Sequence, residues 1–215
     1  MLTLYDYELS GDCYKVRLLL QLLGLSYDRR HVDAYPGAEH RSDWFLALSP
    51  LGDLPVVEDD GALLADPGAI LVYLACRYDP TGTWYPRADA ARLGAVTQWL
   101  FRAARLAGSA GAARLHDGFF LEADIGQARR EAYALLELFD EHLWFAEERG
   151  EPWLCPGANP TIADLACFPD IMLSEEGGIF HRRFPAVRRW TDRVKRIPGF
   201  IVMPGIFPAS TAGAT

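Results

Sequence analysis

Ser10-Gly-Asp-Cys-Tyr-Lys-Val-Arg17 is the stretch that decides the fold. It follows a short alternating strand, residues 2–6, and opens a helix that Gly24 ends. Ser10 and Cys13 have the spacing of a redox Cys-x-x-Cys motif whose first cysteine has become a serine. A hydroxyl cannot do disulfide chemistry, but it can donate a hydrogen bond to a thiolate. The motif therefore predicts a protein that uses a thiol supplied by another molecule.

The chain after this helix continues to alternate between strand and helix patterns. Residues 26–32 predict a second strand, and residues 44–48 predict a short helix. Residues 54–58 and 62–64 flank an Asp-Asp-Gly turn and predict a hairpin, after which Pro67 opens a further helix. The resulting order, β-α-β-α-β-β-α, predicts a mixed sheet flanked by helices.

Everything beyond a Pro- and Gly-containing linker at residues 79–83 has helical patterns. An amphipathic stripe with spacings of three and four is formed by Ile125, Ala128, Ala132, Leu135 and Phe139. Three glycines predict a kink in the first long helix of this part: Gly108, Gly111 and Gly118. Thr161-Ile-Ala-Asp164 has the pattern of a capping box, and residues 187–197 predict the last helix. The segment after Pro208 is expected to pack poorly.

Composition and charge narrow the classes of function. The 215 residues are enough for one large domain or two small ones, and a net charge of −8 without a basic stripe argues against a nucleic-acid partner. No apolar run is long enough to cross a membrane. The four cysteines lie far apart, and neither they nor the histidines have metal-ligand spacing, so no metal is expected. A reducing cytoplasm is the expected location.

The whole chain resembles the soluble glutathione transferases, in particular serine-type bacterial members. The resemblance runs in order through residues 10–17, Ser49-Pro-Leu-Gly-Asp-Leu-Pro55, Ala69-Ile-Leu-Val-Tyr-Leu74, Thr161-Ile-Ala-Asp164 and Phe184-Pro-Ala-Val-Arg-Arg-Trp190. It implies an α/β thioredoxin-like N-terminal domain with a mixed four-stranded sheet, followed by an all-α C-terminal domain. The expected boundaries are 1–79 for the first domain, 80–88 for the linker and 89–215 for the helical domain. The resemblance also implies a homodimer.

The resemblance implies that Ser10 is the catalytic residue. Serine-type transferases place at this position the hydroxyl that steadies the glutathione thiolate. A free thiol has a pKa of about 8.5, so only a few per cent is ionised at pH 7. A hydroxyl donor and the positive end of the following helix would favour the thiolate. The alternative is that Ser10 only caps the helix. For Cys13, a buried structural thiol is favoured over a reactive one.

The resemblance also implies the residues that hold the rest of glutathione. Leu54 and Pro55 match a cis-proline turn whose backbone pairs with the cysteinyl part. Asp66 matches the acidic residue near the γ-glutamyl ammonium, but Pro67 stands where the family has a serine, so a hydroxyl and an N–H are lost. Asp66 is equally well explained as a helix cap.

Two further positions lie toward the expected glycyl end of glutathione. Asp53 stands where relatives often carry Lys or Gln, and its carboxylate would repel the glycyl carboxylate. Asp12, Asp53 and Asp66 around one cleft would form an unfavourable field for glutathione, which carries two carboxylates. His40 matches a glycyl-end contact but is also compatible with a solvated loop residue. Lys15 and Arg41 are the other basic residues that could compensate, although a structural or surface role is favoured for Lys15, as for Arg17.

Aromatic residues and Asp164 complete the expectations for the helical domain. Four aromatics are candidate walls of a hydrophobic second-substrate pocket, although aromatics at helical spacing are more often core: Trp99, Phe101, Phe119 and Phe120. The resemblance gives Asp164 a structural role as a buried capping aspartate.

Three functions follow as hypotheses. The first is a glutathione transferase that attacks a small hydrophobic electrophile, a detoxification reaction. The second is a non-catalytic binding module of the same fold, which the departures at Asp53 and Pro67 favour. The third is a glutathione-dependent disulfide or peroxide reductase in which Cys13 takes part.

Overall fold

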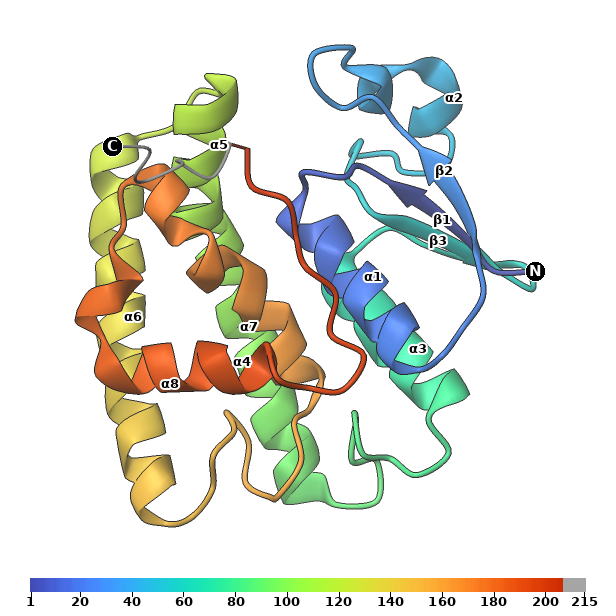
Figure 1. The fold of residues 1–215 in the computed structure, drawn as a ribbon. Helices are drawn as coiled ribbons and strands as arrows, with labels where there is room; N and C mark the ends of the chain where they lie inside the picture. Colours follow the sequence, from blue (N-terminus) through green and yellow to red (C-terminus); the bar gives the residue numbers. More distant parts are fainter. Residues whose placement is uncertain (207–215) are drawn as a thin grey trace, which may run out of the picture.

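The computed structural model describes residues 1–206, and one four-stranded sheet forms the basis of its N-terminal part (Figure 1). The strands are β1 (Thr3–Asp6), β2 (Asp28–His31), β3 (Val56–Asp59) and β4 (Ala62–Leu64). Their order across the sheet is β2-β1-β3-β4, with β1 and β2 parallel and the other two pairs antiparallel. The mixed sheet predicted from the sequence is confirmed.

Helices cover both faces of this sheet, as the alternation of side chains along the strands requires. Leu4 and Val57 are paired between β1 and β3, and both join the main core with α1 (Gly11–Leu22) and α3 (Pro67–Tyr78). The neighbouring residue Val56 faces the other way. It packs with Phe45 of α2 (Asp43–Leu46), which follows the short 3-10 helix η1 (Glu39–Arg41). In Figure 1, α1 and α3 lie between the sheet and the helical part, so the turn that precedes α1 faces that part.

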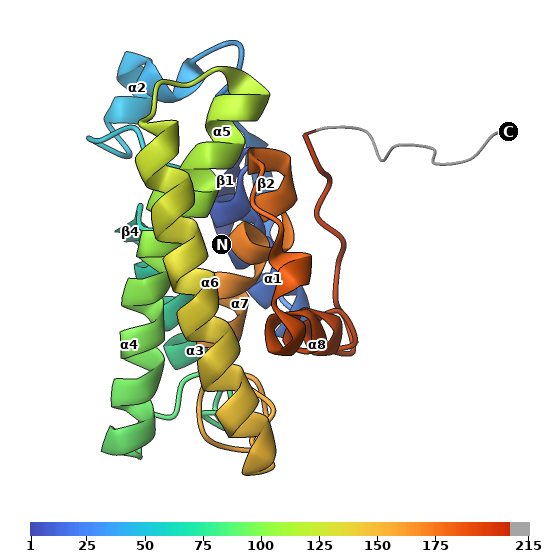
Figure 2. The same cartoon turned by 90° about the vertical axis from the view of Figure 1, so that its left-hand side faces the viewer.

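The second part is all helical. Figure 2 shows α4 and α6 running along its length. Its elements are α4 (Ala90–Leu106), the π-helical η2 (Ala107–Gly111), α5 (Ala112–Phe119), α6 (Ile125–Glu148), α7 (Ile162–Met172), the 3-10 helices η3 (Ser174–Gly177) and η4 (His181–Arg183), and α8 (Pro185–Val194). Within the described residues, α7 is the central element, because it packs against α4 and α8 and also against α1 and α3 of the first part.

Local sequence signals explain the ends and breaks of these helices. The predicted kink near the glycines is the π-helical turn η2, where a Cβ on Gly111 would come within 3.0 Å of the Asp170 carboxylate of α7. The predicted capping box is present at the start of α7. The extension of the last helix to Ile197 was wrong, because α8 ends at Val194. Pro198 disfavours a helical conformation of the residue before it.

Buried hydrogen bonds hold α7 in place. The Asp164 carboxylate is fully buried, and accepts from the backbone N–H groups of Leu154 at 3.1 Å and Thr161 at 2.9 Å. It also accepts from the indole N–H of Trp190 at 2.9 Å, which ties α7 to α8. The structural role expected for Asp164 is supported by these contacts. The segment after Pro208 lies outside the described residues.

Residues 1–206 contain neither a membrane-crossing helix nor a metal-binding cluster. Among the described helices, none combines the length and the apolar character that a membrane crossing needs. The same residues contain no group of three histidine, cysteine or acidic side chains arranged to hold a metal ion.

Candidate active site at the turn between β1 and α1

Ser10 lies in the turn between β1 and α1, as the N-cap of the helix. Its hydroxyl oxygen accepts a hydrogen bond from the backbone N–H of Cys13 at 3.2 Å. The capping role expected as the alternative is therefore real, but it uses only the oxygen's lone pairs. The Ser10 hydroxyl also interacts with the Cys13 thiol and lowers its pKa. A neutral thiol is a weak acceptor, so the same O–H can turn to a charged acceptor.

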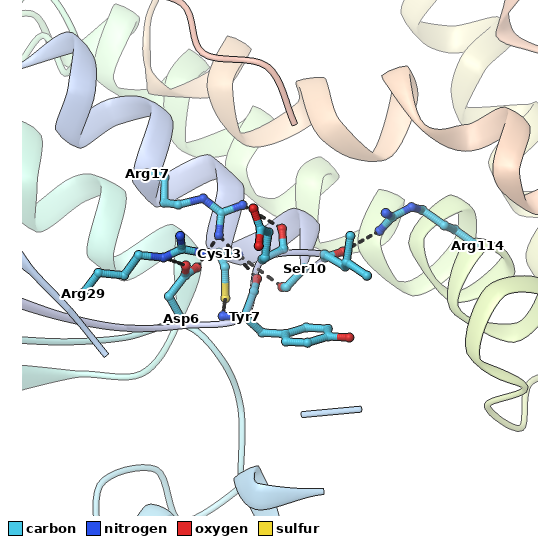
Figure 3. Close-up of polar contacts among 9 residues, drawn as sticks. Asp6, Tyr7, Ser10, Cys13, Arg17, Arg29 and Arg114 are labelled. Carbon is cyan, nitrogen blue, oxygen red and sulfur yellow. Dashed lines mark hydrogen bonds and ion pairs between the residues drawn. The ribbon is translucent and has the colours of Figure 1, made fainter. Parts of the chain in front are cut away.

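The loop before Ser10 is fixed by a buried ionic cluster (Figure 3). The Asp6 carboxylate at the end of β1 is fully buried and pairs with Arg17 and Arg29. Arg17 also donates to the carbonyls of Tyr7 at 3.3 Å and Glu8 at 2.8 Å. This cluster holds the backbone that leads into Ser10, because Arg17 makes charge-assisted hydrogen bonds both to Asp6 and to two carbonyls of the loop.

The Cys13 side chain lies fully buried beneath this turn. Its sulfur accepts the N–H of Tyr7 at 3.4 Å. Burial, and to a smaller extent the negative charge of Asp6, raise the pKa of the Cys13 thiol to about 12. Because the thiolate is the reactive form, Cys13 is inert at neutral pH. The favoured structural interpretation is supported, and the reductase hypothesis loses the thiol assigned to it.

A cavity of about 770 Å³ lies between the sheet domain and the helical part. Four of the predicted glutathione-binding residues line one side of it: Asp53, Leu54, Asp66 and Pro67. The peptide bond between Leu54 and Pro55 is cis, as expected. Pro55 itself is buried, and neither it nor Ser10 nor His40 is among the lining residues. Ser10 lies two positions before Asp12, which does line the cavity.

The rim of the cavity is acidic. Asp12, Asp53 and Asp66 all line it, as the sequence predicted. Asp66 caps α3 by accepting from the N–H of Ala69 at 2.7 Å, and Pro67 takes the first helical position. Of the described residues around the cavity, only Lys15 carries a positive charge.

Of the three basic residues proposed to compensate, only Lys15 lines the cavity, and its charge is already paired. The Lys15 ammonium is buried between Asp12 at 2.6 Å and Asp170 at 2.8 Å. Burial alone would lower the pKa of Lys15, but these two carboxylates raise it above its usual range. Burial and the nearby charge of Arg41 lower the pKa of His40, which disfavours a charged ring. Arg41 itself donates to the carbonyl of Leu51 at 2.8 Å.

The four candidate aromatics have different surroundings. Phe101 is 72% exposed and lines the cavity together with Leu100 of the same helix. Trp99 is buried in the core against Phe139, so its alternative role as a core residue is the one observed. Phe119 stacks on Tyr35 with ring centroids 4.6 Å apart, outside the cavity lining. Phe120 is 82% exposed and also lies outside it.

Two residues of the helical part that reach the first domain were not predicted from the sequence. Asp170 of α7 contacts Lys15, and Arg114 of α5 donates to the carbonyl of Leu9 at 2.9 Å. No local pattern marks either residue, because both act across more than a hundred positions of sequence. A charged residue on an otherwise buried helix segment is the one signal that could have drawn attention to them.

Comparisons with known proteins agree with this geometry. The family model described as glutathione S-transferase, N-terminal domain, matches residues 4–82. The chain is 31% identical to maleylacetoacetate isomerase of Pseudomonas aeruginosa, covering 92% of both chains. It is 30% identical to the disulfide-bond oxidoreductase YfcG of Escherichia coli, again covering 92% of both.

Solved structures give the same assignment. A glutathione S-transferase from Xanthobacter autotrophicus has a TM-score of 0.83 and 32% identity, covering 96% of this chain and 98% of that one. Ure2p in complex with glutathione has a TM-score of 0.80 and 28% identity, covering 92% and 95%. The thioredoxin-like sheet domain, the helical domain and these likenesses over nearly the whole chain lead to one conclusion: the chain belongs to the glutathione S-transferase family.

Proposed function

We propose that this protein is a glutathione transferase in which Ser10 stabilises the glutathione thiolate. The observation that carries the proposal is the place of the Ser10 hydroxyl at the positive end of α1, where it contacts the N–H and the thiol of Cys13. The hydrogen-bonded thiolate would attack an electrophilic carbon. A carbon–sulfur bond then forms, and the leaving group departs with its electron pair.

The cavity between the two parts supplies room for both substrates. On the side of the sheet domain, the backbone of Leu54 would pair with the cysteinyl unit of glutathione, and Asp66 would lie near its ammonium. Asp53, Pro67 and His40 complete the proposed binding region, with Pro55 fixing the turn. The glutathione complex of Ure2p supports this choice of ligand.

The opposite side of the cavity suits an apolar electrophile. Leu100, Phe101, Ala103 and Ala107 line it from α4 and the adjoining π turn. An uncharged hydrophobic compound can bury its surface there without leaving a charge unpaired. A detoxification role, a cytoplasmic location and a homodimer belong to the same proposal through the family resemblance.

The chemistry of Cys13 favours this reaction over a reductase that uses Cys13. A reductase in which Cys13 takes part would need that thiol to ionise and to be accessible, and its burial and pKa of about 12 oppose both. A disulfide-bond oxidoreductase is nevertheless among the relatives. Reduction by bound glutathione alone, without Cys13, is therefore the second candidate.

Calorimetry and a rate assay test the proposal together. Glutathione titrated into the purified protein should bind with a dissociation constant at or below the millimolar range, and the protein should then conjugate glutathione to an activated chloroarene. Absence of binding at millimolar glutathione would contradict both the transferase and the reductase. Binding without conjugation, but with reduction of a mixed disulfide, would favour the second candidate.

A further inference from the structure

Arg114 is a buried cation that the proposed chemistry does not yet use. It lies on α5 of the helical part and is only 4% exposed. Its Nε donates to the Glu176 carboxylate of η3 at 2.6 Å, and its Nη1 donates to the carbonyl of Leu9 at 2.9 Å. Its remaining nitrogen, Nη2, is shielded from solvent and has no hydrogen-bond partner among the described residues. A buried guanidinium nitrogen left without a partner is unfavourable, which calls for an explanation.

Arg114 completes the fixation of the loop that carries Ser10. The loop exposes three successive carbonyls, and a guanidinium binds each one. Arg17 of the first domain donates to the carbonyls of Tyr7 and Glu8, and Arg114 of the helical part donates to the carbonyl of Leu9. The peptide between Leu9 and Ser10 is thus held from the opposite domain. In Figure 3 the Arg114 guanidinium points toward this end of the loop.

The surroundings of Arg114 keep it in this position. Gly177 of η3 packs so closely on α5 that a Cβ there would come within 2.6 Å of the Arg114 backbone nitrogen. This close approach brings the neighbouring Glu176 against the Nε edge of the guanidinium. Because the guanidinium is a rigid planar fork, its Nη1 edge is thereby aimed at Leu9.

Among the cations near Ser10, Arg114 is the one whose buried Nη2 donor has no partner among the described residues. The charged and titratable groups nearby are Asp6, Tyr7, Glu8, Asp12, Cys13, Lys15, Arg17, Arg29, Asp33, Tyr35, Asp170 and Glu176, and Arg29 pairs with Asp6. The Lys15 ammonium is bound by two carboxylates, and Arg17 is bound by Asp6. Arg114 acts on this region, since it opposes the burial and the Asp33 charge that raise the pKa of Tyr7.

We propose that Arg114 is a positioning residue of the transferase, which fixes the Leu9–Ser10 peptide from the helical part and favours the ionised form of a thiol held at Ser10. The inference rests on the proposed function. The step involved is a simple ionisation, in which the S–H bond of glutathione releases its proton to water and the sulfur keeps the electron pair. The positive charge near the Leu9 carbonyl stabilises the product of that step through a medium of low dielectric.

The test is the pH dependence of the conjugation rate at saturating glutathione. In Arg114→Gln, the apparent pKa of the bound thiol should rise by about one unit, so that the rate near pH 6.5 falls about tenfold while the rate well above that pKa stays close to wild type. Arg114→Lys keeps the charge and should keep most of the low-pH rate.

Two controls separate this effect from damage to the fold. The double variant Arg114→Gln/Glu176→Gln also removes the carboxylate paired with Arg114, so it is measured if Arg114→Gln alone does not fold. Arg129→Gln is the matched control. Arg129 also binds one carbonyl and one carboxylate, those of Gly177 and Asp117, but it has no contact with the loop before Ser10.

The outcomes are distinguishable. A shifted pH profile in Arg114→Gln or the double variant, absent in Arg114→Lys and Arg129→Gln, supports the inference. Equal rate losses at all pH values in both Arg114 variants would mean a purely structural role and would overturn it. A wild-type protein that binds no glutathione would overturn the proposed function and this inference together.

Discussion

At the scale of single residues, the environment of Asp53 conflicts most with a ligand that carries two carboxylates. Asp53 lines the cavity with Asp12 and Asp66, and the only basic side chain among the described lining residues, Lys15, is paired with two carboxylates. A carboxylate in this position repels an anion across a few ångströms, an interaction of about 1 kcal/mol where water screens it. The affinity for glutathione should therefore be lower than it would be with a cation at this position.

Asp53→Lys should strengthen glutathione binding. Replacing repulsion by attraction is expected to lower the calorimetric dissociation constant by about five- to tenfold at low salt, and added salt should reduce the gain. Glu58→Lys is the control, because it makes the same change of net charge at an exposed site on β3 outside the cavity lining. Equal affinities for Asp53→Lys and wild type would show that Asp53 does not face the ligand.

At the scale of elements, α1 and α7 together determine where Ser10 lies. The Ser10 cap begins α1, and α7 packs along α1 with Asp170 against Lys15. The start of α7 is in turn fixed by Asp164, whose carboxylate accepts hydrogen bonds from two backbone N–H groups and from the Trp190 indole. Removing that carboxylate leaves buried donors without an acceptor, so the effect should fall on stability.

Asp164→Ala should destabilise the protein by roughly 3 kcal/mol, the loss expected when buried donors lose their acceptor. Denaturant unfolding measures this directly. Asp192→Ala, which removes a half-exposed carboxylate of α8 paired with Lys195, should change stability by less than about 0.5 kcal/mol. A loss below about 1 kcal/mol for Asp164→Ala would show that the capping contacts contribute little.

The elements could be predicted because their signals are local. The Ser10 turn, the Asp-Asp-Gly hairpin and the Thr161 capping box each depend on a few neighbouring residues, and all are present. The end of α8 was misplaced because apolar periodicity continued to Ile197 while Pro198 had already stopped the helix.

Arg114 was missed because its partner Leu9 lies 105 positions away, and no spacing in the sequence encodes that contact.

At the scale of the whole molecule, the candidate site belongs to both parts of the chain. The sheet domain contributes Ser10 and the acidic rim, and the helical part contributes the apolar wall and Arg114. The relatives carry the names of different reactions, an isomerase and a disulfide-bond oxidoreductase among them, so the fold alone does not choose between them. The boundaries 1–79, 80–88 and 89–215 and the homodimer stay predictions.

The most direct test of the central claim is the pKa of the glutathione thiol bound to the protein, followed by the ultraviolet absorbance of the thiolate. Wild type should hold the thiol with a pKa well below the free value of about 8.5. In Ser10→Ala the pKa of the bound thiol should be higher by about one to two units, since a hydrogen bond to a charged group contributes about 1.5–3 kcal/mol. The same pKa in both proteins, with glutathione bound to each, would contradict the role assigned to Ser10.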